Sequence, residues 1–61
     1  MSFTIKIVTN KEEILLENLS ETEVREAIAD AYTCISKTNK YVTFNGLAKI
    51  SALDLQHFYI M

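Results

Sequence analysis

The segment SETEVREAIADAYTCISK, residues 20–37, decides the fold, because it holds the clearest helix signal in the chain. Ser20 and Glu23 have the spacing of a capping box, in which each side chain accepts a hydrogen bond from the other residue's backbone N–H. Glu21 and Glu26 add negative charge at the helix start, where the helix dipole favours it. The pattern predicts a helix over residues 21–37.

One side of this helix is apolar at helical spacing, which predicts a stripe that packs on a sheet. The predicted stripe consists of Val24, Ala27, Ile28, Ala31, Cys34 and Ile35. The residues predicted to face water are Arg25, Glu26, Asp30, Thr33 and Lys37. Asn39 is predicted to take the left-handed conformation that stops a helix.

Two strands are predicted before the helix. FTIKIV, residues 3–8, places Phe3, Ile5 and Ile7 on one face, which is the alternation of a half-buried strand. Residues 11–17 allow two interpretations, because Asn10 and Glu13 also have capping-box spacing and would start a helix. We favour a hairpin strand at 13–17, since the next helix has its own start signal.

Three strands are predicted after the helix. Asn45-Gly46 is a strong signal for a type I′ turn, and strands at 41–44 and 47–51 would flank it. A last strand is predicted at 54–60 after a bend near Ser51-Ala52. The sequence therefore predicts an α+β fold over a single domain, residues 1–61. Its order is β-β-α-β-β-β, a small antiparallel sheet with one helix packed on one face.

Length and composition suggest that the domain needs help to be stable. The chain has 61 residues, of which 49% are apolar and 23% charged, and a domain of this size buries only about 60% of the surface its unfolded chain exposes. Cys34 is the only cysteine, so no internal disulfide forms, and with His57 it is too little for a zinc site. We expect no cofactor, and we expect unusually good packing or self-association to supply stability.

The sequence contains no predicted export signal and no apolar run long enough to cross a membrane. With a single thiol, the cytoplasm is the expected compartment and no membrane partner is expected.

Charge is distributed unevenly along the chain, although the net charge is only −2. Residues 12–30 hold seven acids against Arg25, which predicts an acidic face for binding a basic partner. The acidic face is expected to consist of Glu17, Glu21, Glu23 and Glu26. The aromatic residues predicted on strands are Tyr41, Phe44, Phe58 and Tyr59. Such residues can stack on nucleic-acid bases, but no basic groove accompanies them, which argues against a nucleic acid as partner.

No catalytic set can be assembled from this inventory. Asp54 and His57 are an odd number of residues apart in a strand and so face opposite sides. A Cys34–His57 pair would need the two to meet and a third group to orient the imidazole. The sequence therefore predicts a protein that is not an enzyme.

The last strand, LDLQHFYIM, is apolar on both faces near its end. The faces are predicted as Leu53, Leu55, His57, Tyr59 and Met61 on one side, and Asp54, Gln56, Phe58 and Ile60 on the other. One helix can cover only one face, and the other could be closed by curvature of the small sheet or by the 13–17 hairpin. We favour a homo-oligomer, with an interface of aromatic and methionine side chains. The predicted interface consists of His57, Phe58, Tyr59, Ile60 and Met61, with Tyr32 on the helix.

The run from ENLSETEVREAI to the closing segment resembles small accessory proteins of phages and prophages of Gram-positive bacteria. The residues that carry the resemblance are Ile50, Asp54, Leu55, Phe58 and Ile60, in a closing hairpin that ends the chain. The resemblance implies a non-enzymatic protein that binds a host factor or a host defence component and alters its activity.

Two functions from different classes follow. The first is a small homo-oligomeric protein that binds and modulates or inhibits a host or defence protein. The alternative is an oligomer that encloses a nucleotide or a similar anion between subunits, for which the candidate ligand-binding residues are Lys40, Lys49, His57 and Tyr59.

Overall fold

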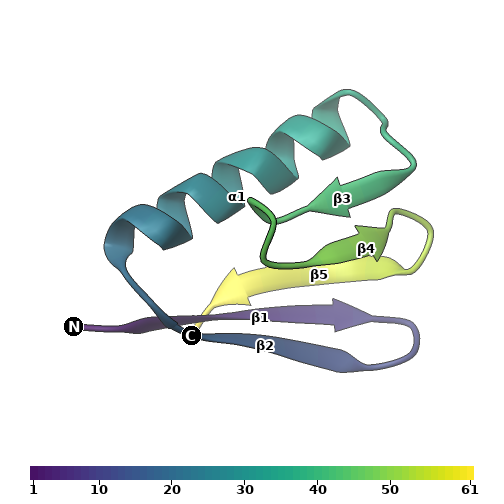
Figure 1. The fold of residues 1–61 in the computed structure, drawn as a ribbon. Coiled ribbons are helices and arrows are strands. Elements are labelled where there is room, and N and C mark those ends of the chain that lie inside the picture. Colours follow the sequence, from purple (N-terminus) through teal and green to yellow (C-terminus); the bar gives the residue numbers. More distant parts are fainter.

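The computed structural model describes residues 1–61 and confirms an α+β fold with one helix on antiparallel strands (Figure 1). The elements are β1 (Phe3–Thr9), β2 (Glu13–Leu19), α1 (Glu21–Ser36), β3 (Tyr41–Thr43), β4 (Lys49–Ser51) and β5 (Leu55–Ile60). All predicted elements are present in the predicted order, and β4 begins two residues later than expected. The open question about residues 11–17 is settled in favour of a strand.

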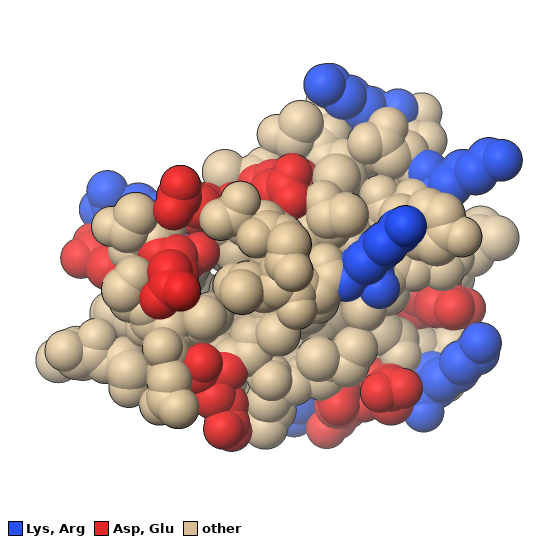
Figure 2. Space-filling model, viewed as in Figure 1, with Lys and Arg blue, Asp and Glu red and all other residues tan.

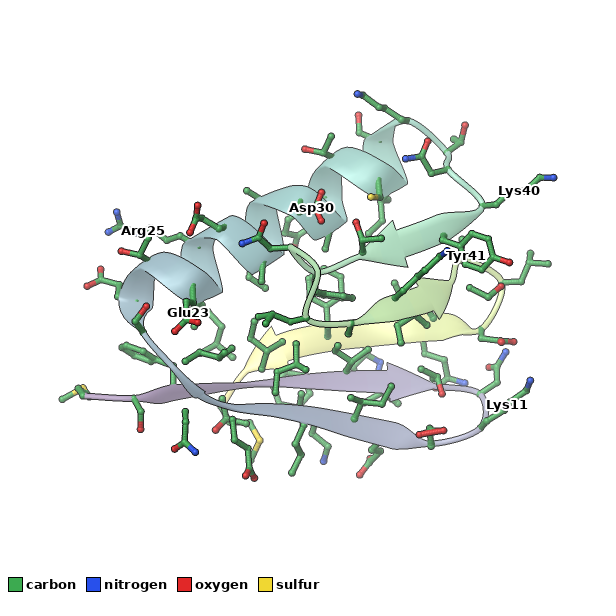
Figure 3. The ribbon with its side chains drawn as sticks, in the orientation of Figure 1. Lys11, Glu23, Arg25, Asp30, Lys40 and Tyr41 are labelled. Atoms are coloured by element: carbon green, nitrogen blue, oxygen red, sulfur yellow. The ribbon has the colours of Figure 1, made fainter.

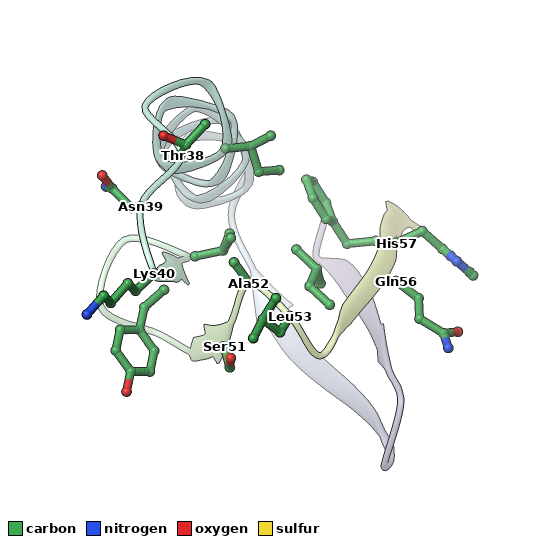
Figure 4. A pocket seen from close by; sticks show the side chains of 13 residues that line it. Thr38, Asn39, Lys40, Ser51, Ala52, Leu53, Gln56 and His57 are labelled. Carbon is green, nitrogen blue, oxygen red and sulfur yellow. The ribbon is translucent and has the colours of Figure 1, made fainter.

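The strands divide between two sheets, a detail that the sequence did not indicate. A three-stranded sheet has the order β2-β1-β5, and β3 and β4 form a separate two-stranded hairpin. All pairs are antiparallel. Figure 4 looks along α1 and shows the helix above the hairpin on one side and β5 on the other. Side chains from all three parts line the space between them.

The helix begins as predicted. The Ser20 hydroxyl accepts from the Glu23 backbone N–H at 3.1 Å, and the Glu23 carboxylate accepts from the Ser20 N–H at 2.8 Å. The capping box therefore satisfies two N–H groups that lack partners within the helix.

The apolar stripe of α1 is narrower than predicted. Its buried residues are Val24, Ala27, Ala31 and Cys34. Ile28 is half-buried, and the prediction that Ile35 is buried is wrong, because 44% of its surface is exposed. Ile28, Tyr32 and Ile35 form a row along one flank of the helix, at spacings of four and three residues. No element of the fold covers this flank fully.

The helix ends one residue earlier than predicted, and the residue with the left-handed conformation is Thr38, with φ 54°, and not Asn39. The Thr38 N–H donates to the Ile35 carbonyl and the Asn39 N–H donates to the Cys34 carbonyl, each at 3.0 Å. This is the paired arrangement of a Schellman motif, which requires the left-handed residue at the position Thr38 occupies.

Asp30 is half-buried and its carboxylate has partners on the hairpin, so the prediction that it faces water is wrong. Its carboxylate accepts from the Thr43 hydroxyl at 2.6 Å and from the Asn45 backbone N–H at 2.8 Å (Figure 3). These two hydrogen bonds hold the pKa of Asp30 below its usual range, and the one from Thr43 has the larger effect. The hairpin lies on the helix at this point, so Asp30 fastens α1 to the β3–β4 turn.

The turn at Asn45-Gly46 is confirmed. Both residues have positive φ, 53° and 79°, and the Leu47 N–H donates to the Phe44 carbonyl at 2.9 Å. The turn points Phe44 into the core, where it is fully buried. The other fully buried large side chains are Ile5, Ile7 and Val42.

The faces of β5 are correct from His57 onward and wrong for Leu55. A register shift between Val8 and Thr9 of β1 marks a β-bulge in β5, because Val8 pairs with His57 and Thr9 with Leu55. The extra residue turns Leu55 toward the core, on the same side as Phe58. His57 and Tyr59 remain on the outer face.

Candidate functional site

A groove of about 760 Å³ opens at the carboxyl end of α1, between the helix, the β3–β4 hairpin and the start of β5 (Figure 4). Its apolar walls consist of Ile35, Tyr41, Val42, Ala52, Leu53, Leu55 and Phe58. Its polar rim consists of Thr38, Asn39, Lys40, Ser51, Gln56 and His57. The groove is the open end of the core, and its size lies in the range of sites that hold a small ligand or an anchoring side chain of a partner.

The groove exists because β4 and β5 separate after the turn that joins them. The Asp54 N–H donates to the Ser51 carbonyl at 2.9 Å, which closes the turn, but β5 then pairs only with β1. Leu53 projects from this turn with 90% of its surface exposed. Leu53 lies beside the other apolar walls of the groove, and a contiguous exposed apolar patch is typical of a binding surface.

The rim carries a positive charge that no acid of the chain neutralises. The ion pairs are Lys6–Glu13, Lys11–Asp54 and Arg25–Glu21, so Lys40 has none. An occupant with acidic and apolar groups would therefore complement this groove. Figure 2 shows basic side chains at the upper right that lie apart from the acids, whereas those at the left and lower right lie against acids.

β5 has one edge without hydrogen-bond partners. The Met61 N–H donates to the Thr4 carbonyl at 2.9 Å, and the register pairs Tyr59 with Lys6. In an antiparallel ladder alternate residues point their peptide groups to opposite edges, so those of Phe58 and Ile60 point away from β1. β5 pairs with no strand on that side.

This edge also lacks the usual protection. β5 reads LQHFYI and contains no lysine, acid or proline, the residues that proteins place on edge strands to prevent pairing. The other outer edge, on β2, carries Glu13 and Glu17 and has an irregular register near Asn18, whose φ is 59°. Charge repulsion therefore protects β2 and not β5, and the bulge of β5 lies at Gln56, before Phe58 and Ile60.

Apolar side chains continue from the β5 edge to the uncovered flank of α1. The rings of Tyr32 and Phe58 lie 5.4 Å apart, and the Phe58 ring meets that of Phe44 edge to face at 5.1 Å. Tyr32 and Ile60 are 60% and 51% exposed. Phe58 thus connects the core to an exposed apolar strip made of Tyr32, Ile35 and Ile60.

The predicted interface residues do not share one surface. Ile60 and Tyr32 belong to this strip and Phe58 lies next to it, whereas His57 and Tyr59 lie on the outer face of the sheet with their rings 6.0 Å apart. The outer face is amphipathic: Lys6 pairs with Glu13 at 3.3 Å, and Leu15 is 48% exposed. The hydrogen bond to Glu13 and its charge raise the pKa of Lys6.

The acidic face is exposed, but two of its members have structural partners. Glu23 completes the capping box, and Glu21 binds Arg25 at 2.9 Å. Glu17 and Glu26 are exposed and form no ion pair.

The alternative ligand-binding residues are not brought together. Lys40 lines the groove, but Lys49 lies over the Tyr41 ring at 4.4 Å from its centroid. His57 touches the groove rim while its ring points away from the groove (Figure 4). Tyr59 faces outward on the sheet.

Cys34 and His57 also lie apart, because Cys34 is buried under the helix and His57 is on the outer sheet face. Cys34 Sγ lies 3.4 Å from the Thr43 hydroxyl oxygen. Since Thr43 donates its only hydroxyl hydrogen to Asp30, the thiol must donate to Thr43, which makes a chain of hydrogen bonds that joins α1 to β3. No three His, Cys, Asp or Glu side chains converge as a metal site requires.

The aromatic residues do not form a platform for bases. Phe44 is fully buried and the ring of Phe58 packs against it. Tyr41 and Tyr59 are exposed, but they lie on different sheets.

Comparisons with protein families, with curated proteins and with solved structures find no match to this chain. No helix of the chain is long and apolar enough to span a membrane.

Proposed function

We propose that this chain is a small non-enzymatic binding protein that acts as a homo-oligomer and modulates or inhibits a partner protein by occupying its surface. The observation that carries the proposal is the groove at the carboxyl end of α1, with its apolar walls and uncompensated Lys40. Binding at such a place requires no convergent catalytic groups, and apolar anchors in pockets dominate protein recognition.

The chemistry of the groove favours a partner segment that carries an apolar side chain beside acidic residues. Leu53 and Tyr41 would supply the apolar contact, and Lys40 would face the acid at the rim. The resemblance to phage accessory proteins makes a host or defence protein of a Gram-positive bacterium the expected partner.

A capture experiment with paired variants tests this. Immobilised wild-type protein, Leu53→Asp and Leu15→Asp would each be exposed to the same Gram-positive lysate. Both leucines are exposed, at 90% and 48%, so neither change empties the core. We expect a protein that wild type and Leu15→Asp retain and Leu53→Asp loses, with Lys40→Glu weakening retention further at low salt. Equal retention by Leu53→Asp would contradict the groove as the contact.

The nucleotide-binding alternative has less support, since its four candidate residues are divided between the groove, the hairpin and the outer sheet face. It stays a prediction, and a thermal-shift screen with nucleotides tests it. A ligand that binds the native state raises the melting temperature by mass action. An unchanged melting temperature at saturating nucleotide would exclude the nucleotide-binding alternative, and protein binding would be the one remaining proposal.

A further inference from the structure

We propose that two copies of this chain pair through the free edge of β5, antiparallel and about a two-fold axis, so that their three-stranded sheets join into one. This rests on the proposed function only in taking the chain as a homo-oligomer. The partner is a second copy because the edge is uncharged, so two identical edges meet without repulsion. The same two-fold pairing through the edge of β2 would place Glu13 and Glu17 of one copy next to those of the other, and these like charges would repel.

The hydrogen bonds determine the register. Phe58 and Ile60 each present a free N–H and a free carbonyl at this edge, on the alternation described above. Pairing Phe58 with Ile60 of the second copy satisfies all of these groups in both copies. A register centred on Phe58 would instead pair Ile60 with Gln56, which lies in the bulge where the alternation is broken.

This register places like side chains on like faces. Tyr59 faces Tyr59 of the second copy on the outer face, where aromatic cross-strand pairs are favourable. Phe58 and Ile60 meet on the inner face, beside the row of Ile28, Tyr32 and Ile35 on α1. Because directly opposed residues share a face, both helices lie on the same side of the joined sheet.

The apolar strip beside the edge supplies contact area that a strand pair alone lacks. A specific interface buries about 800 Å² on each partner, which is about a fifth of the 4206 Å² accessible surface of this chain. Tyr32, Ile35 and Ile60, at 60%, 44% and 51% exposed, are the large apolar residues that the pairing would cover.

A cysteine cross-link tests the register. Tyr59 and its counterpart would form a non-hydrogen-bonded pair with Cα atoms about 4.5 Å apart, within the range of a disulfide. In a Cys34→Ala background, Tyr59→Cys is expected to give a covalent dimer on mild oxidation, and the control Leu15→Cys, on β2, is expected to stay uncross-linked. Cross-linking by Leu15→Cys and not by Tyr59→Cys would overturn the proposal.

Light scattering from micromolar to millimolar concentration provides the second arm. We expect a dimer for wild type and for the control Ile60→Val, and a monomer for Ile60→Pro, because proline removes a donor that points away from β1 and leaves the ladder to β1 intact. Ile60→Lys provides a variant with the same expected outcome and no change at the backbone. If wild type is a monomer at every concentration, the pairing is overturned. The proposed contact of the groove with a partner protein is tested separately, by the lysate capture with Leu53→Asp.

Discussion

Thr38 is a β-branched residue in the left-handed conformation, so replacing it with glycine should stabilise the protein. Its φ of 54° is required by the Schellman motif that ends α1. This conformation costs a residue with a Cβ about 1–2 kcal/mol. Glycine avoids that cost but loses about 0.5–1 kcal/mol through its greater freedom in the unfolded chain. The hydrogen bond from the Thr38 hydroxyl to the Lys37 carbonyl, at 2.6 Å, is exposed, and water replaces it.

The net expectation for Thr38→Gly is a gain of about 0.5–1 kcal/mol in the free energy of unfolding, measured by urea denaturation. A thermal melt should rise by several degrees, since 1 kcal/mol moves the midpoint by about 4–8 °C in a domain of this size. Thr33→Gly is the matched control: Thr33 is exposed inside α1, and glycine there should cost about 0.3 kcal/mol, the difference between the two helix propensities. A loss of stability in Thr38→Gly would refute the assignment of the helix end.

Three further variants test the fastening of the core. Asp30→Asn should destabilise the protein at neutral pH. Because the Thr43 hydrogen bond lowers the folded pKa of Asp30, its contribution is present above the unfolded pKa of about 3.9 and is lost as pH falls through the folded value. Urea denaturation at several pH values should therefore show that the difference in free energy of unfolding between Asp30→Asn and wild type becomes smaller in acid. Glu26→Gln is the control, and it should have the stability of wild type at neutral pH. Ser20→Ala should cost about 1 kcal/mol by removing the helix cap, measured by urea denaturation at neutral pH. Phe44→Ala should cost about 3–5 kcal/mol, a large part of the total expected for a chain of this length at roughly 0.05–0.15 kcal/mol per residue, and urea denaturation followed by far-ultraviolet circular dichroism should show a midpoint at much lower urea than in wild type.

Local patterns were enough to predict the elements. The capping box of Ser20 and Glu23, the alternation around Ile5 and Ile7 and the Asn45-Gly46 turn each act within a few residues, so the sequence predicts them directly. Where several residues could serve the same local role, prediction was less accurate. The helix end requires one left-handed residue, and the choice of Thr38 over Asn39 depends on where the chain must turn to form β3.

Long-range contacts explain the remaining errors. Ile35 has the spacing of a buried residue, but nothing covers its flank because β5 pairs with β1 and not with β4. Leu55 changes face because of a bulge that only the pairing with β1 defines. Asp30 has the pattern of a solvent-facing residue, and its partners on Thr43 and Asn45 come from the hairpin.

The candidate site was predicted only in part. The prediction that the end of the chain needs cover was based on its apolar residues, and Ile60 is exposed, together with Tyr32 and Ile35 on α1. The groove was missed because it arises from the separation of two sheets. Its sequence signal was Leu53, an apolar residue at a predicted bend. The free edge had a clearer signal, which is the absence of charge across residues 55–60.

Amide hydrogen exchange of β5, followed by nuclear magnetic resonance at high protein concentration, tests most directly whether a second copy closes this edge. The N–H groups of Tyr59 and Met61 bond to β1 and should exchange slowly in any state of assembly. If β5 pairs with its copy, the N–H groups of Phe58 and Ile60 should be equally slow and should become fast on dilution. Fast exchange at Phe58 and Ile60 beside slow exchange at Tyr59 and Met61, at every concentration, would contradict the account.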